Sequence, residues 1–359
     1  MITLFGATGY TGQRIARVLD RTGQTFRLAG RSREKLHALA ATLSSRPNLV
    51  VAEVGTPASL AGLFESTRVL INCAGPFIDL GEPVIVQAAT RGVHYLDITN
   101  ELAYVYRLRQ YDALARKTGA AIVSACAFEV AISDCVIAQQ ARDLSKPLDA
   151  AHIIYGYTNP NGVMSYGTRL SGLRTLAKSW IAYRGGKWVG RQPATEARAW
   201  QMNGRTRRAI TFPSAEVVTV PAHCAVQDVQ AWLAVSTRWA YVMPVVMPLV
   251  NLLLNTPIGS LMALSFRHLA PPPPERSDEN FRFVIQIELT GGNSARTITL
   301  RGFDPYGLTA EIAVYAAGII GQAGYARAGV LAPSLAFDPD AFVTWLTTTQ
   351  GVTLSIEEH

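Results

Sequence analysis

The sequence has few charged residues and no paired cysteine motif, and these absences exclude several classes of protein. Only 16% of its 359 residues are charged and 49% are hydrophobic, which excludes extended disorder. The four cysteines contain no C-x-x-C pair and the six histidines no H-E-x-x-H spacing, so we expect neither a metal site nor a disulfide framework. The formal charge is +7, but no dense Lys/Arg run with interleaved aromatics is present, so we expect no nucleic-acid partner.

Three closely spaced glycines come almost at the start of the chain. "LFGATGYTG", residues 4–12, places Gly6, Gly9 and Gly12 between the short apolar run Ile2–Phe5 and a segment with apolar residues at helical spacing. A strand, a glycine turn and a helix that begins at the turn direct backbone N–H groups and the positive helix end to one point, which suits a pyrophosphate. The pattern therefore favours a dinucleotide site, and tight strand-to-helix packing is the alternative.

The end of the second expected strand, "FRLAG", lacks the acidic residue that would bind the ribose 2′-OH of NAD. Arg31, Ser32 and Arg33 follow it instead. A guanidinium matches a phosphate with two hydrogen bonds, so this position favours the 2′-phosphate of NADP. The alternative is a solvated basic start of the next helix.

Apolar runs continue to alternate with helical stretches up to about residue 126, which predicts a doubly wound α/β fold with a parallel sheet. Ligands of such sheets bind at the carboxyl ends of the strands, which here carry Glu53, "CAGPF" at 73–77 and "DITNE" at 97–101. Thr99 fits best as a helix cap, whereas Asp97 and Glu101 suit either a cap or a substrate contact.

The length and a change of pattern predict further domains after the first. We expect a dinucleotide-binding domain at 1–147 and a second α+β domain at 148–305, where runs at 151–159, 216–222, 280–292 and 295–304 predict a mostly antiparallel sheet. Residues 306–359 are expected to form a helical segment that returns to the first domain. A cleft between the domains would hold the small-molecule substrate, with Ser165 and Thr168 lining it or capping a helix.

One Tyr-x-x-x-Lys pair, Tyr183 and Lys187, occurs outside the dinucleotide half. The sequence between them is "RGG", and two glycines disfavour the single helix face on which such a pair would act. We therefore interpret the pair as coincidental.

Residues 239–266 contain no charged side chain but include three prolines. We expect two short helices here, which form a buried hairpin, a homodimer interface, a wall for an acyl substrate or a peripheral membrane contact. Because the first strand begins at Ile2, the sequence leaves no room for a secretory signal before it. The expected location is therefore cytoplasmic, with membrane association as the alternative.

"GATGYTG", "LAGRSREKL", "CAGPF", "YLDITNE" and the later "GVLAP" resemble the saccharopine dehydrogenase-like oxidoreductases, and within them the branch called trans-acting enoyl reductases. The resemblance implies a Rossmann domain that binds NADP, with the glycine turn on the phosphates, Arg31 on the 2′-phosphate and residues 73–77 beside the nicotinamide. The candidate cofactor residues are Gly6, Thr8, Gly9, Tyr10, Thr11, Gly12, Arg31, Ser32, Arg33, Glu53, Cys73, Ala74, Gly75, Pro76 and Phe77.

The sequence departs from the family pattern on the side where a substrate would bind. A stretch of the type "GFDSxPSD" reads "AFEVAISD" at 127–134, with Ala127 for Gly and Glu129 for Asp, and Asn100 replaces the usual glycine of the "DxTGE" turn. The substrate candidates are Asp97, Asn100, Glu101, Asp134, Ser165 and Thr168. No catalytic residue is assigned.

The predicted function is an NADP-dependent oxidoreductase that reduces an enoyl or related unsaturated hydrophobic substrate, either free or bound to a carrier protein. Two alternatives remain. One is an amino-acid or imine oxidoreductase of the saccharopine reductase kind, and the other is a non-catalytic, membrane-associated NADP-binding protein.

Overall fold

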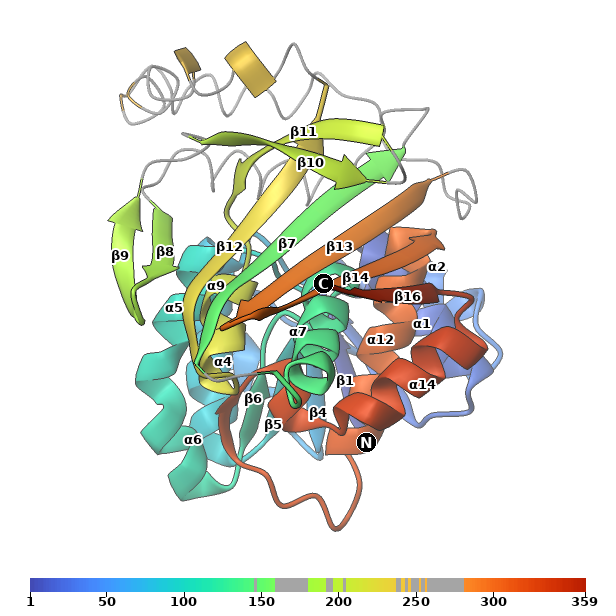
Figure 1. Cartoon of the computed structure of the whole chain (residues 1–359). Helices are drawn as coiled ribbons and strands as arrows, with labels where there is room; N and C mark the ends of the chain where they lie inside the picture. Colours follow the sequence, from blue (N-terminus) through green and yellow to red (C-terminus); the bar gives the residue numbers. More distant parts are fainter. Residues whose placement is uncertain are drawn as a thin grey trace. The chain divides into compact units, whose positions relative to one another are not determined.

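The computed structural model describes residues 1–144, 147–158, 180–191, 196–202, 205–236 and 281–359, together with 240–242, 245–246, 252 and 256. These residues form two compact units (Figure 1). Unit 1 contains residues 1–100, 104–132 and 306–338, and unit 2 contains residues 101–103, 133–305 and 339–359. The segment expected to return to the first domain, 306–359, is thus divided between the two units after residue 338.

Unit 1 is built on a sheet of seven parallel strands. The strands are β1 (Ile2–Phe5), β2 (Phe26–Gly30), β3 (Asn48–Val51), β4 (Val69–Asn72), β5 (His94–Asp97), β6 (Ala121–Val123) and β15 (Gly329–Leu331). Their order is β3-β2-β1-β4-β5-β6-β15, and the first six strands follow the Rossmann order. All residues of β1, β4 and β5 are buried, as expected of a parallel sheet with both faces covered. The predicted doubly wound fold is confirmed.

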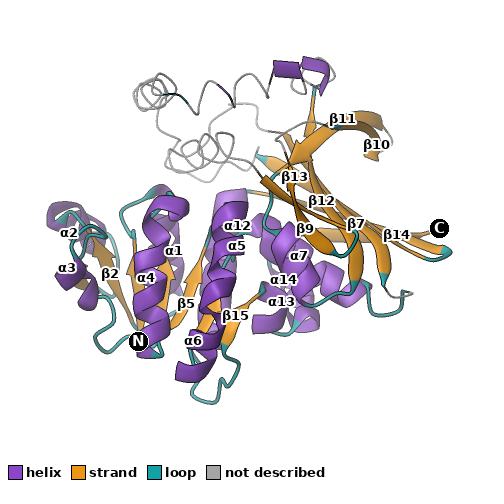
Figure 2. Cartoon of the chain, turned by 90° about the vertical axis from the view of Figure 1, so that its left-hand side faces the viewer, coloured by secondary structure: helices purple, strands orange, loops and turns teal. Residues whose placement is uncertain are grey.

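Helices connect these strands. They are α1 (Tyr10–Arg21), α2 (Arg33–Ala41), α3 (Pro57–Ala61), α4 (Phe77–Arg91), α5 (Leu102–Leu108), α6 (Asp112–Thr118), α12 (Pro305–Ile320) and α13 (Pro333–Ala336), with a 3-10 turn at Arg109–Tyr111. Figure 2 shows α4 and α6 along the near side of the sheet, whereas α1 contacts α12 through a 2.6 Å hydrogen bond from Arg21 to Glu311. Because every strand runs in the same direction, the loops that follow β1, β2, β4, β5 and β6 open at one edge. We call it the carboxyl edge.

Unit 2 is built on a nine-stranded sheet with β7 (Leu148–Thr158) near its centre. The other strands are β8 (Trp180–Arg184), β9 (Lys187–Arg191), β10 (Ala197–Met202), β11 (Arg205–Phe212), β12 (Val226–Val235), β13 (Arg282–Gly291), β14 (Ser294–Phe303) and β16 (Thr353–Glu358). Only the pair of β12 and β7 is parallel among the described strands of this sheet. The predicted mostly antiparallel sheet is therefore confirmed.

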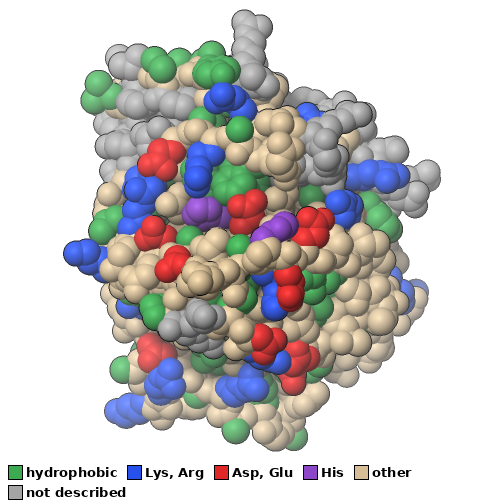
Figure 3. Space-filling model, viewed as in Figure 1, with side chains coloured by type: hydrophobic (Ala, Val, Ile, Leu, Met, Phe, Trp, Pro, Cys, Tyr) green, Lys and Arg blue, Asp and Glu red, His purple; other side chains and the backbone are tan. Residues whose placement is uncertain are grey.

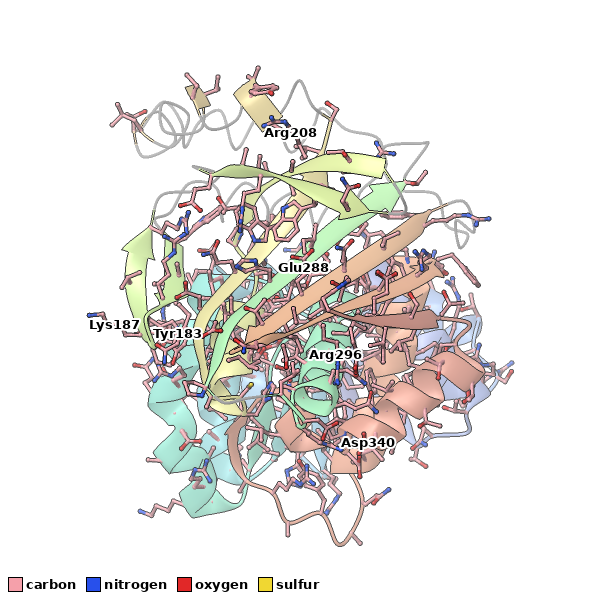
Figure 4. All side chains as sticks on the ribbon, in the orientation of Figure 1. Tyr183, Lys187, Arg208, Glu288, Arg296 and Asp340 are labelled. Atoms are coloured by element: carbon pink, nitrogen blue, oxygen red, sulfur yellow. The ribbon has the colours of Figure 1, made fainter. Side chains whose placement is uncertain are left out.

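The C-terminal end of α7 (Phe128–Gln140) is held in unit 2 by contacts to Asp340 and Arg296, which Figure 4 labels. Asp340, in α14 (Pro339–Thr349), accepts hydrogen bonds from Gln139 at 2.8 Å and from Arg142 at 2.5 Å. Gln139 belongs to α7. The backbone carbonyl of Gln140, the last residue of α7, accepts a hydrogen bond of 2.6 Å from Arg296 on β14. These contacts tie the C-terminal end of α7 to the C-terminal part of the chain.

The prediction of a strand at 216–222 is wrong. Residues Glu216–Thr219 form the short helix α9, and Val220–Ala222 form a 3-10 turn. The β-branched residues of "EVVTV" favour a strand, but Glu216 is fully buried and accepts hydrogen bonds from Ser133 on α7 and Tyr155 on β7. These tertiary contacts override the local preference.

Tyr183 and Lys187 lie at the two ends of a hairpin turn between β8 and β9, and not on a helix (Figure 4). Gly185 and Gly186 form the turn with φ angles of 56° and 73°, which few other residues adopt. Gly185 also donates its N–H to Asp228 on β12 at 2.9 Å. The two glycines therefore serve the hairpin.

Several expectations fall on residues outside the described part of the chain. They include Ser165, Thr168 and most of 239–266. Within the described residues, no helix is long and apolar enough to cross a membrane.

We expect Gly81→Ala in α4 to lower the free energy of unfolding by about 1–3 kcal/mol, because a Cβ there would lie 2.4 Å from the hydroxyl oxygen of Tyr104. Gly318→Ala in α12 is the matched control, since nothing lies within 4 Å of its Cβ position. That variant should gain about 0.5–1 kcal/mol from reduced backbone freedom. Urea denaturation measures both changes, and equal effects of the two substitutions would contradict the prediction.

Candidate functional site

The glycine turn places three glycines in different surroundings. A Cβ on Gly12 would lie 2.3 Å from the carbonyl oxygen of Gly6, and one on Gly6 would lie 2.7 Å from the backbone nitrogen of Ala74. Gly6 also has a φ of 77°. Gly9 is exposed, and a Cβ there would meet only the Gly6 oxygen at 3.3 Å. Close packing within the protein therefore explains Gly6 and Gly12, whereas the exposed backbone of Gly9 is open to a ligand.

Helix α1 begins at Tyr10 with Gly9 as its N-cap and without a side-chain cap. The positive end of this 12-residue helix is therefore presented by backbone N–H groups alone, which fits a pyrophosphate. Tyr10 packs edge-on against Tyr306 at 4.9 Å between ring centroids, and its hydroxyl accepts a hydrogen bond from Arg14. Its ring is thus fixed beside the turn. Thr11 follows within the first turn of the helix.

Arg31 directly follows β2. Its side chain is exposed and makes no hydrogen bond or ion pair with any residue that the structure describes. Ser32 caps α2 by accepting a 3.3 Å hydrogen bond from the Lys35 N–H, and Arg33 is the first residue of that helix. Thr8 approaches the same strand end, since its hydroxyl lies 3.9 Å from a Cβ position on Gly30. An unengaged guanidinium at a helix N-terminus fits the 2′-phosphate of NADP.

Glu53 lies two residues beyond β3 and is exposed. Its backbone N–H and carbonyl both bond to the hydroxyl of Ser59, each at 3.0 Å.

The loop of residues 73–77 joins β4 to α4 at the carboxyl edge and contains a cis peptide bond between Gly75 and Pro76. Gly75 is exposed, Cys73, Ala74 and Pro76 are half-buried, and Phe77 is buried against the ring of Tyr104 at 5.9 Å. Burial and the nearby Asp97 carboxylate raise the pKa of the Cys73 thiol, which keeps it neutral. Phe77 therefore supports the loop, while the residues before it reach the surface.

Asp97 ends β5 and is fully buried. One carboxylate oxygen accepts hydrogen bonds from the N–H of Thr99 at 3.2 Å, the hydroxyl of Ser124 at 2.8 Å and the N–H of Ala125 at 3.0 Å. The other oxygen accepts the hydroxyl of Tyr95 at 3.0 Å. Burial raises the pKa of this carboxyl from 3.8 to about 6, against the lowering effect of these donors. Asp97, predicted as a substrate contact, thus bonds to the protein through both oxygens.

Asn100 and Glu129 form a half-buried polar pair at the carboxyl edge. The amide of Asn100, after β5, donates to a carboxylate oxygen of Glu129 at 2.8 Å, and Glu129 lies in the first turn of α7. Both residues depart from the family pattern, and the structure brings them into contact across 29 positions of sequence. Glu129 was not among the predicted site residues. The signal that could have identified Glu129 is that two segments at the same sheet edge, one with Asn100 and one with Glu129, both depart from the family pattern.

Asp134 and Glu101 belong to unit 2 and are both buried. Asp134 lies 2.9 Å from His223 Nε2, and this contact holds α7 to the segment before β12. Glu216 is a further buried carboxyl of unit 2, and burial raises its pKa.

Sequence analysis also missed a group of polar and aromatic side chains on the sheet of unit 2. His152 on β7 faces Trp200 at 5.6 Å and Trp232 at 6.2 Å between ring centroids, and the guanidinium of Arg198 lies over both indoles. Glu288 pairs with His152 on the adjacent strand (Figure 4). Figure 3 shows acidic, basic and histidine side chains gathered on this face. Burial lowers the pKa of His152 to about 4, so the ring is neutral at pH 7.

The site geometry agrees with a match of residues 2–125 to the family model of the saccharopine dehydrogenase NADP-binding domain. This part of the chain is therefore similar to a saccharopine dehydrogenase NADP-binding domain. Its cofactor is NADP, in agreement with the uncapped helix α1 and the unengaged Arg31.

Relatives of known name match part of the chain. The trans-acting enoyl reductase of Mycobacterium tuberculosis is 34% identical over 149 residues, which cover 39% of this chain and 35% of that protein. A probable mitochondrial saccharopine dehydrogenase-like oxidoreductase of Arabidopsis thaliana is 33% identical over 144 residues, covering 36% of this chain and 32% of that protein. The chain thus spans about a third of the length of these relatives.

The fold extends the likeness to the whole chain. Apo saccharopine dehydrogenase (L-Glu forming) of Saccharomyces cerevisiae has a TM-score of 0.67 with 11% identity, and the match covers 100% of this chain and 99% of that one. The NADP-binding domain and the mixed sheet therefore occur together in a saccharopine dehydrogenase fold. Among the described residues, no group of three or more His, Cys, Asp or Glu could hold a metal ion.

We expect Arg31→Ala to weaken NADPH binding about 10- to 100-fold, because it removes a charge-assisted hydrogen bond of about 1.5–3 kcal/mol to the 2′-phosphate. NADH lacks this phosphate and is the matched control ligand. Isothermal titration calorimetry measures both dissociation constants. Equal affinities for NADPH and NADH in the unsubstituted protein would contradict the assignment.

We expect Asp97→Asn to change how stability depends on pH. The folded state holds the Asp97 proton more tightly than the unfolded chain, so this carboxyl stabilises most below pH 3.8 and loses that contribution as the pH rises to about 6. The gap corresponds to about 3 kcal/mol. Relative to Asp97→Asn, the wild type should therefore lose about this free energy of unfolding between pH 4 and 7. Urea denaturation at both pH values tests this, and a constant difference would refute it.

Proposed function

We propose that the protein reduces an enoyl or related unsaturated hydrophobic substrate, such as an acyl or polyketide-like chain, with NADPH as the hydride source. The observation that carries the proposal is the pairing of an exposed glycine backbone at the start of α1 with an unengaged Arg31 at the end of β2. This arrangement suits NADPH and leaves the loop of residues 73–77 for the nicotinamide side. The name of the mycobacterial relatives supports the enoyl substrate.

A second candidate, an amino-acid or imine oxidoreductase, is favoured by one feature. The Glu129 carboxylate, held by the Asn100 amide, places a negative charge at the carboxyl edge. A negative charge there stabilises a substrate that carries a protonated nitrogen. An enoyl substrate gains nothing comparable from it.

Three proposals concern partners. The substrate is carried by an acyl carrier protein, the chain forms a homodimer, or the region 239–266 contacts a membrane. The side chains of Tyr241, Val245 and Leu252 in that region are 60%, 70% and 70% exposed, which supports contact of this region with another apolar surface. Size-exclusion chromatography and liposome co-sedimentation test the last two proposals.

The proposed function is tested by NADPH oxidation, measured by absorbance, with matched enoyl thioesters, imines and carbonyl compounds. We expect turnover with the enoyl thioesters and none with their saturated counterparts. Glu129→Gln should leave enoyl reduction within a few-fold but reduce turnover of a cationic imine strongly, because it removes the charge and keeps the shape. Tight NADPH binding without turnover of any substrate would instead indicate a non-catalytic NADP-binding protein.

A further inference from the structure

We propose that Asp97 is a positioning residue that fixes the loop of residues 73–77 through Tyr95 and Asn72. The three residues form a continuous hydrogen-bond chain within unit 1, which ends on the backbone N–H of Ala74. The claim that this loop borders the nicotinamide rests on the proposed function. The claim that the chain of hydrogen bonds fixes the loop is independent of the proposed function.

The charge on Asp97 sets the direction of every bond in this chain. An ionised carboxylate can only accept, so the Tyr95 hydroxyl must donate to it at 3.0 Å. The hydroxyl lone pairs then accept from the Asn72 amide nitrogen, also at 3.0 Å, and from the Tyr104 hydroxyl at 3.1 Å, which must donate because the Tyr95 proton is directed to Asp97. This fixes the amide orientation, and the Asn72 carbonyl oxygen accepts the Ala74 N–H at 2.9 Å. A buried network that is fully directed in this way holds one geometry.

The opposite end of the chain is held rigidly. The second oxygen of Asp97 accepts bonds from Thr99, Ser124 and Ala125, in the loops that follow β5 and β6. Ala125 adopts a φ of 62°, which is uncommon for a residue other than glycine and is maintained here by its N–H bond to Asp97. Asp97 therefore joins three loops of the carboxyl edge.

The position of Ala74 also matters for the phosphate end of the site. Its backbone nitrogen would lie only 2.7 Å from a Cβ on Gly6, so the loop packs directly on the glycine turn. A displaced Ala74 would change the turn on which the pyrophosphate is expected to rest. One hydrogen-bond chain thus determines the geometry on both sides of the cofactor site.

Tyr95→Phe tests the proposal because it breaks the chain between Asp97 and Asn72 and retains the aromatic ring. Ser124→Ala is the matched control, since it removes a buried hydrogen bond to the same carboxylate but leaves the path to Ala74 intact. The measurements are amide hydrogen exchange at Ala74 in the ligand-free protein and the dissociation constant of NADPH. Exchange at Leu70 in the core of β4 reports global stability in each variant.

We expect Tyr95→Phe to accelerate exchange at Ala74 relative to Leu70 about tenfold and to weaken NADPH binding by a similar factor. Ser124→Ala should change neither the exchange of Ala74 relative to Leu70 nor the dissociation constant of NADPH. Asn72→Ala should reproduce the effect, and adding Tyr95→Phe to it should produce no further change, because both act on one path. Asn72→Ala also provides the test if Tyr95→Phe does not fold.

Equal effects of Tyr95→Phe and Ser124→Ala on the Ala74 exchange ratio, or additive effects of the Asn72 and Tyr95 substitutions, would overturn the proposal. Failure of the proposed function gives a different result. In that case the wild type does not bind NADPH, while the exchange at Ala74 still responds to Tyr95→Phe and not to Ser124→Ala.

Discussion

The buried carboxylate of Asp97 is the constraint on which the geometry of the carboxyl edge depends. A parallel sheet aligns the ends of its strands, but it does not by itself determine the paths of the loops that leave them. Four donors converge on this one group: the hydroxyl of Tyr95 on β5, the N–H of Thr99 after β5, and the Ser124 hydroxyl and Ala125 N–H after β6. A carboxylate can be buried in this way only because its oxygens are satisfied, and an incomplete set of donors would be costly. The loops are therefore held in one arrangement.

The glycine turn shows two different requirements within one short motif. Gly6 and Gly12 lack side chains because protein backbone occupies the space that a Cβ would need. Gly9 has no side chain at a position where its backbone is exposed, at the start of α1, which no side chain caps. The first two glycines thus allow strand, turn and helix to pack closely. The third leaves the helix N-terminus accessible to an anion, and Arg31 adds a positive charge for a second phosphate.

The named relatives match only part of this chain. Asn100 and Glu129, which depart from the resembled family pattern, lie in direct contact at the carboxyl edge. Unit 2 has its own buried polar groups, including the Asp134–His223 pair and the Glu216 carboxyl with its two hydroxyl donors. A site that fits NADP is thus accompanied by the Asn100–Glu129 contact and by a separate set of buried polar groups in unit 2.

The sequence by itself determined the doubly wound parallel sheet, the glycine turn, the basic residues after β2 and the change to an antiparallel sheet, because these depend on local periodicity and on residues that are adjacent in the chain. It predicted a parallel sheet from apolar runs up to about residue 126, but it could not show that β15 completes that sheet or that β16 pairs with β14, since both contacts join distant segments. It also assigned "EVVTV" to a strand, where burial of Glu216 favours a helix. Only the tertiary structure decided that Asp97 is enclosed by its donors and that Asn100 meets Glu129. The physical reason is that burial and long-range hydrogen bonds depend on which loops the fold brings together, and local sequence patterns do not encode that proximity.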